Sequence, residues 1–422
     1  MPSGTKLKIM LAALAWKNLW RNKLRSAIII TAIAIGIIGG VISNGLMTGM
    51  ADQRINSAIA NEISNIQIHA PRFLLNHEIQ YMLPAQINWV EKLKKYPEVK
   101  GVSGRLDCQA MASSASAGAG IMAYGVIPED ELRVSDIYQH VIEGSYLNNQ
   151  QRLPAVIGKK LANKLNLLIG DRIIITLSDT SGTITSGAFK IVGIYKTAND
   201  LFDGSSVFVR RKDLAAVLNV HPQRIHEVAI RLKNNASTDK VIRQIKKDFS
   251  TQVMQKQIVV QSWKQIDPLL QSMIEMMNMF SYIFMMVILV ALAFGIVNTM
   301  IMAIMERTRE FGMLMALGLN KKKTFSLIML ETLFLSLAGA VFGVVVSLLI
   351  VHHYAVTGFD LSAMGKGMNS IGYSAIVHFR VDTDFYLTTI FMVIFVAIIS
   401  AISPARKALK LQPANAIRDN QL

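Results

Sequence analysis

The sequence predicts an α-helical membrane protein with four transmembrane helices and a large α+β domain outside the membrane. Four apolar segments carry this prediction, because each is near or above the roughly 20 residues that a helix needs to cross a bilayer. About 230 residues of mixed sequence separate the first segment from the other three. The segments span residues 26–47, 279–305, 324–351 and 385–403. Glu331 is their single charged residue, and a soluble core requires no apolar runs of this length.

Basic residues beside the segments predict their orientation. Of the 44 Lys and Arg residues, 15 lie in the stretches 1–25, 306–323 and 404–422. Short stretches rich in Lys and Arg remain in the cytoplasm. We therefore expect both termini inside, and the domain 48–278 and the loop 352–384 outside. The rest of the chain is only mildly basic, so the net charge of +16 indicates contact with membrane lipids and no nucleic-acid partner.

The N-terminal segment 1–25 alternates apolar and basic residues, as an amphipathic helix on the inner membrane surface does. The apolar run 26–47 is longer than the core of a cleavable signal peptide. We therefore interpret it as a retained transmembrane helix.

Periodicity within 48–278 predicts two βαβ units. Apolar and polar residues alternate at 64–69, as in a half-buried strand, and the apolar-rich stretches 99–111, 226–232 and 257–261 are also interpreted as strands. Helical spacing appears at 86–95 and 238–249. This order predicts a split ferredoxin-like subdomain. It would consist of 48–111 and 223–262, interrupted by an inserted β-rich subdomain, 112–222, and followed by a helical lead, 263–278, into the second transmembrane helix.

Motifs for catalysis are absent from the sequence. There is no phosphate-binding loop for ATP, no zinc-ligand spacing and no nucleophile motif. Cys108 is the one cysteine, so no disulfide forms within the chain. His352 and His353 end a transmembrane segment, and we interpret them as an interfacial pair. The sequence predicts no enzyme, no cofactor and no metal site.

The cytoplasmic stretch after the second segment reads ERTREFGMLMALG, residues 306–318. It resembles the E-R-x-x-E-[IF]-G signature of the ABC permease group that includes MacB, FtsX, LolC and LolE. Three further stretches match at the family's places: AWKNLWRNKLRS before the first segment, ETLFLSLAGAVFG in the third, and SPARKALKLQPANAIR at the end.

The resemblance implies a permease subunit of the bacterial inner membrane that transmits the motion of a separate ATPase. Two ATPase copies and a second permease copy or a paralogue would complete the transporter. In the family, the helix after the second span docks on the ATPase. A coupling role is thus implied for Glu306, Arg307, Arg309, Glu310, Phe311, Gly312, Leu317 and Gly318, within a coupling helix at 306–323.

Within the group, VIGKKLANKLNLLIGDRIIITL is similar to the lipoprotein-releasing branch, which implies release of lipoproteins toward the outer membrane. The connection 178–187 is shorter than the proline-bearing hook with which LolC-type permeases capture a periplasmic lipoprotein carrier. Carrier capture, a LolC-like or LolE-like role, and a homodimer or heterodimer stay open. The alternatives are MacB-like export of a peptide or antibiotic and FtsX-like signalling to a cell-wall hydrolase.

Three features of the membrane segments predict contacts. Gly339 and Gly343 form a small-xxx-small face, which favours close packing on a neighbouring helix. A carboxylate facing lipid is costly, so we expect Glu331 to face protein or the headgroup boundary. The Met-rich outer ends of the first two spans fit irregular apolar ligands, and together with the resemblance they imply a lateral cleft for acyl chains between these spans. Its expected lining is Ile37, Val41, Met47, Met276, Phe280 and Phe284.

Overall fold

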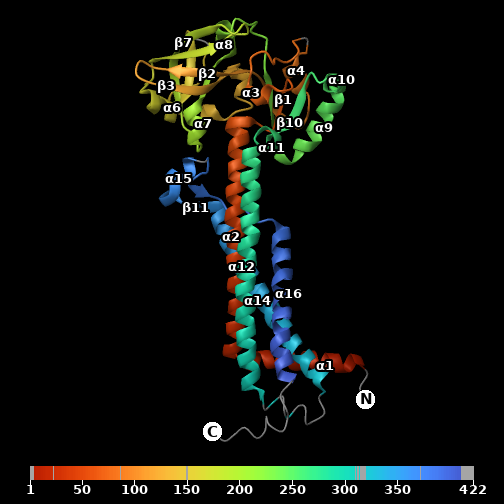
Figure 1. Cartoon of the computed structure of the whole chain (residues 1–422). Helices are drawn as coiled ribbons and strands as arrows, with labels where there is room; N and C mark the ends of the chain where they lie inside the picture. The colour runs from red at the N-terminus through yellow and green to blue at the C-terminus, as the bar shows by residue number, and fades with distance from the viewer. Residues whose placement is uncertain are drawn as a thin grey trace. The chain divides into compact units, whose positions relative to one another are not determined.

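The computed structural model describes residues 4–21, 23–85, 87–148, 151–308, 310, 313, 320–370 and 372–409. The chain forms two compact units (Figure 1). The first, which we call the membrane unit, consists of 1–51, 275–359 and 377–422. The second, which we call the β unit, consists of 52–274 and 360–376.

Four helices of the membrane unit are long and apolar enough to cross a membrane, which confirms the predicted number within the described part of the chain. They are α2 (Lys23–Ala58), α12 (Pro268–Glu306), α14 (Lys321–Thr357) and α16 (Thr383–Leu409). Each predicted apolar segment lies inside one of them, and α2 and α12 continue beyond the membrane unit. Helix α1 (Gly4–Arg21) lies at a steep angle to the long helices (Figure 1).

Small residues let the backbones of α2 and α14 approach closely. A Cβ added to Gly339 would lie 2.8 Å from the Cβ of Ile33, and one added to Gly343 would lie 3.0 Å from the Cα of Ala34. Helices in lipid associate through such close van der Waals packing, since lipid tails are as apolar as leucine. The buried contact between these helices therefore depends on the two glycines.

The first part of the β unit is an antiparallel sheet in the order β10-β1-β9-β2. Its strands are β1 (Ile66–His69), β2 (Val99–Ser113), β9 (Glu227–Leu232) and β10 (Val259–Ser262). Helices α4 (Trp89–Leu93) and α9 (Thr238–Asp248) contribute side chains such as Trp89 and Val241 to an apolar cluster that includes Ile68 and Ile230 of the sheet.

Six strands close into a ring in the second part of the β unit. In the order β2, β3 (Gly118–Val126), β8 (Ser206–Arg210), β5 (Pro154–Gly158), β7 (Ile184–Tyr195) and β6 (Arg172–Ser178), each pairs with the next. Strand β6 also pairs with β2, which closes the ring. An apolar cluster with side chains such as Phe189 and Leu161 fills it, and β4 (Val141–Gly144) adds to β7.

Strand β2 belongs to both parts, which differs from the expected boundary between 111 and 112. Residues 99–105 pair with β9, whereas residues 106–113 pair with β3. One uninterrupted strand spans both partners because its buried side chains continue from one apolar cluster into the next. The boundary therefore falls within β2 rather than after it.

The remaining α-helices and strands are short. In the β unit and its flanks they are α3 (Phe73–Asn76), α5 (Pro128–Glu131), α6 (Lys159–Leu165), α7 (Asp200–Ser205), α8 (Arg211–Val217), α10 (Ser250–Met254), α11 (Trp263–Ile266), α15 (Gly365–Ser370), β11 (Phe359–Asp360) and β12 (Ile376–Val377). The segment 352–384 is thus more than a loop, because it contains α15 and contributes 360–376 to the β unit.

A charged cluster is buried inside the β unit. The guanidinium of Arg105 lies 2.6 Å from a carboxylate oxygen of Glu131 and 3.1 Å from one of Glu227. The Asp107 side chain is equally buried beside them. Burial raises the pKa of Glu227 to about 7, and the attraction of Arg105 only partly offsets it. Three carboxyl groups around one guanidinium therefore favour uptake of a proton.

Candidate functional site

The predicted coupling residues lie where α12 ends within the membrane unit. Glu306 is the last residue of α12, and Arg307 and Glu310 follow it. Arg309, Phe311, Gly312, Leu317 and Gly318 lie outside the described residues. The chain re-enters a helix at Lys321, where the side chain of Asn320 accepts hydrogen bonds from the backbone N–H groups of the first turn of α14.

Four side chains form a chain of alternating charge at this place. Glu331 of α14 accepts two hydrogen bonds from Nη1 of Arg307, at 2.9 and 3.2 Å. Nε of Arg307 donates to Glu310 at 2.9 Å, and Glu310 also pairs with Arg21 of α1. The order Arg21–Glu310–Arg307–Glu331 thus connects α1, the segment after α12, and α14.

The inner pair of this charge chain is more buried than the outer pair. The side chains of Arg307 and Glu331 are 10% and 13% exposed, whereas those of Glu310 and Arg21 are 39% and 53% exposed. Burial alone would raise the pKa of Glu310, but hydrogen bonds from Arg307 and Arg21 outweigh it, so this pKa lies below its usual value. Exposed ion pairs are weak and screened by salt, while breaking a buried pair is costly. The buried Arg307–Glu331 pair is therefore costly to break, whereas the exposed Glu310–Arg21 pair can be replaced by contacts with water or a partner at little cost.

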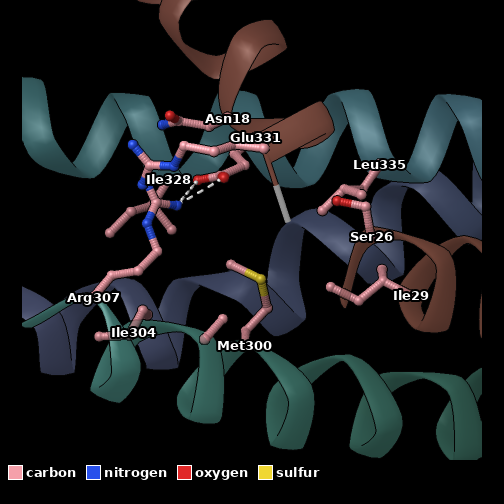
Figure 2. A pocket seen from close by; sticks show the side chains of 11 residues that line it. Asn18, Ser26, Ile29, Met300, Ile304, Arg307, Ile328, Glu331 and Leu335 are labelled. Atoms are coloured by element: carbon pink, nitrogen blue, oxygen red, sulfur yellow. Dashed lines mark hydrogen bonds and ion pairs between the residues drawn. The ribbon is translucent and has the colours of Figure 1, made fainter. Parts of the chain in front are cut away.

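A cavity of about 30 Å³ adjoins the inner pair. Figure 2 shows Arg307 and Glu331 pointing toward each other at one side of it, with Met300, Ile304 and Leu335 among the other residues that line it. A space of this size accommodates a water molecule where polar partners are present. The carboxylate and the guanidinium supply such partners, so the cavity has room for one water molecule beside the ion pair.

Helix α1 is held against α14 by aromatic packing. The rings of Trp16 and Phe334 meet edge to face, with 5.7 Å between their centroids. The hydroxyl of Ser26 donates to the carbonyl oxygen of Leu19 at 2.6 Å, which fixes the corner between α1 and α2. Arg21 is thereby placed beside Glu310. No sequence pattern indicates this pairing, because 289 positions separate the two residues.

The residues predicted to line a lateral cleft do not form one surface. Ile37 and Val41 are fully buried in the apolar cluster of the membrane unit. Met276, Phe280 and Phe284 are 47%, 41% and 49% exposed on α12, and Met47 is half-buried on α2. Since Ile37 also lies against Gly343 of α14, the predicted set splits into a packed group on α2 and an exposed group on α12.

Two family models match this chain. The MacB-like periplasmic core domain matches residues 26–248, which is more than half of the chain, and the FtsX-like permease C-terminal domain matches residues 282–413. The chain therefore belongs to the ABC transporter permeases. More narrowly, it is a member of the group that contains MacB, FtsX, LolC and LolE, as its coupling stretch predicted.

Three relatives illustrate the similarity. An uncharacterized ABC transporter permease of Methanocaldococcus jannaschii is 25% identical over 65% of this chain and 65% of its own length, so the match spans just under two thirds of that relative. The lipoprotein-releasing system transmembrane protein LolE of Haemophilus influenzae is 22% identical over 78% of this chain and 80% of its own. The lipoprotein-releasing system transmembrane protein LolC of Neisseria meningitidis serogroup B is 22% identical over 85% of this chain and 87% of its own length.

Proposed function

We propose that this chain is a permease subunit that releases lipoproteins from a bacterial inner membrane, driven by a separate ATPase. Both termini would lie in the cytoplasm, beside two ATPase copies and a second permease copy or paralogue. Support comes from the basic residues next to the apolar segments. The similarity to LolC and LolE over more than three quarters of the chain also supports the proposal.

The observation that carries the coupling role is the charge chain Arg21–Glu310–Arg307–Glu331. Glu310 belongs to the stretch that resembles the ATPase-docking helix of the family. Any displacement of Glu310 must break its pairs with Arg307 and Arg21 or move those residues with it. ATPase movement would therefore reach α1 and α14 as well as α12.

We also propose the split ferredoxin-like architecture with an inserted subdomain for the region outside the membrane. The strand order β10-β1-β9-β2 supports the first part of this architecture. So do the helices that connect β1 to β2 and β9 to β10 along the chain. The six-strand ring supports a separate inserted part. The hairpin β6–β7 turns at 179–183, where the Asp179 carboxylate accepts from the backbone of Ser181 and Thr183. A hairpin this short argues against capture of a lipoprotein carrier by this part of the chain.

For the acyl chains of the cargo, we propose the exposed group on α12: Met276, Phe280 and Phe284. Ile37 and Val41 remain packing residues in this proposal, because they are buried within the chain itself. An acyl chain that slides from the bilayer onto this face does not pass through water, so the transfer costs little hydrophobic free energy.

Co-purification with the ATPase tests the coupling role. Glu310→Lys should weaken ATPase binding and its stimulation by the permease, because a charge reversal at a docking surface costs several kcal/mol. The control is Glu91→Lys, the same reversal at an exposed site in the β unit. Equal binding and stimulation by both variants and the unmodified protein would reject the assignment.

The cargo is tested separately. A photo-crosslinker at Phe280 should label lipoprotein or lipid, and the labelling should fall when ATP binds. Co-purification of a periplasmic adaptor would instead favour MacB-like export. Co-purification of a cell-wall hydrolase with no lipid crosslink would favour FtsX-like signalling.

A further inference from the structure

One end of the membrane unit carries a polar cavity that the proposed function does not use. It has a volume of about 680 Å³ and lies between α2, α12 and the start of α16. Asn44, Asn278 and Ser281 line it from α2 and α12, and Asp382, Asp384 and Thr388 line it from the α16 side. Nδ2 of Asn44 donates to the hydroxyl of Ser281 at 2.9 Å, which joins two of its walls.

The charge of this cavity is negative. Two carboxylates line it, and no Lys, Arg or His is among the described residues that do so. Arg380 lies 3.6 Å from Asp382, with both side chains more than 60% exposed, so it screens that carboxylate only in part. This lining therefore favours a cationic group in the cavity.

An apolar cavity of about 490 Å³ continues from the polar one along α12. Asn278 and Tyr282 line both cavities. Glu275 also lines the second one, and its apolar wall is formed by Met279, Ile283, Met286 and Val287. These four side chains are 48–66% exposed. A polar, negatively charged recess thus adjoins an open apolar strip on a helix that is long and apolar enough to face lipid.

We propose that these two cavities bind one phospholipid with a primary amine in its headgroup, taken from the membrane leaflet at this end of the helices. The ammonium group lies at Asp382 and Asp384, and one acyl chain lies along Met279, Ile283 and Met286. Under the orientation proposed above, this is the outer leaflet. The lipid site does not depend on which cargo the transporter moves.

The selectivity of this site comes from the headgroup. An acyl chain that leaves the bilayer for α12 exchanges one apolar environment for another, so the strip holds every lipid about equally. A primary ammonium donates three hydrogen bonds to carboxylates and polar side chains. Methylation of the nitrogen keeps the charge and removes these donors, so phosphatidylcholine lacks the contacts that phosphatidylethanolamine makes.

The test uses the full-length protein in nanodiscs that contain phosphatidylcholine, phosphatidylethanolamine and phosphatidylglycerol with identical chains. A photo-crosslinking amino acid replaces Met286, and mass spectrometry identifies the labelled lipids. The matched control is the same amino acid at Met302, which is also on α12 and is also 66% exposed. We expect about threefold enrichment of phosphatidylethanolamine at 286 over 302, as expected for weak interfacial charge pairs.

Three variants check the headgroup contact. Asp384→Asn and Asp382→Asn should abolish the enrichment at 286 without moving the thermal unfolding midpoint. Arg380→Gln should increase it, because this change removes the cation beside Asp382. Equal labelling by all three lipids, enrichment of phosphatidylglycerol, or labelling only by protein would overturn the proposal. Each outcome is independent of the ATPase-binding test of the proposed function.

Discussion

Replacing Arg307 by leucine should destabilise the membrane unit more than replacing Glu331 by leucine. Arg307→Leu leaves Glu331, 13% exposed, without the guanidinium that lies 2.9 Å away, and it also removes one partner of Glu310. Glu331→Leu leaves Arg307 with Glu310 still at 2.9 Å. We expect a loss of about 3 kcal/mol for Arg307→Leu, as for breaking a buried pair, and about 1–2 kcal/mol for Glu331→Leu.

The double variant Arg307→Leu/Glu331→Leu should lose less than the sum of the two single variants. It leaves no uncompensated charge between α12 and α14, and Glu310 keeps its pair with Arg21. Replacing a buried ion pair by apolar residues is often close to neutral. The coupling energy of this double-mutant cycle should therefore reach about 2 kcal/mol.

Reversible unfolding in detergent, followed by tryptophan fluorescence, measures the three losses under one condition. Leucine is used at both positions because it fits a membrane helix and introduces no new polar group. Additive losses, with a coupling energy below about 0.5 kcal/mol, would refute the reasoning, since independent sites add within that margin. A larger loss of stability for Glu331→Leu than for Arg307→Leu would also contradict the order Arg21–Glu310–Arg307–Glu331 of the charge chain.

Three further predictions, each with a matched variant, can be checked by thermal unfolding of the full-length protein. Gly339→Ala should destabilise by about 1 kcal/mol, because the added Cβ would lie 2.8 Å from Ile33. Its control, Gly295→Ala, should stabilise by up to about 1 kcal/mol, because open space surrounds the position of the added Cβ outside the backbone of α12 itself. Asn320→Ala should remove the cap of α14 and cost about 1 kcal/mol, whereas Asn320→Asp keeps an acceptor there. The pKa of Glu227 is raised to about 7 by burial, so the folded state binds its proton more tightly than the unfolded state does, and the stability this adds is lost as the pH rises from about 5 through 7. Glu227→Gln should flatten this pH dependence.

The apolar helices and most strands of the β unit follow from the sequence. The strands predicted at 99–111 and 226–232 are found at Val99–Ser113 and Glu227–Leu232, because residues buried on a sheet leave a regular pattern of apolar side chains. The closed ring was not predictable, since it requires β6 to pair with both β2 and β7. Periodicity reports that a segment is a strand and carries no information about its distant partner.

The orientation of residues within the membrane helices was also beyond the sequence. Helix α2 is apolar on all sides, so hydrophobicity does not distinguish its lipid-facing side from its protein-facing side. Ile37 and Val41 are therefore buried in the bundle where a lateral cleft was expected. Residue size carries more information than hydrophobicity here, because the glycines of α14 mark the face that contacts α2.

Glu331 shows why a charged residue persists in an apolar segment. An unpaired carboxylate within a membrane helix would cost about 3 kcal/mol, and this one is paired by a residue that lies just beyond the end of another helix. The pair ties the last turn of α12 to α14 at one depth, since sliding either helix by a turn would separate the charges. The outer end of the charge chain, Arg21 and Glu310, has no such penalty, because both side chains are accessible to water. Under the proposed coupling role, a partner that displaces Glu310 would move Arg307 and α14 with it, and would either break the exposed contact with Arg21 or move α1 as well.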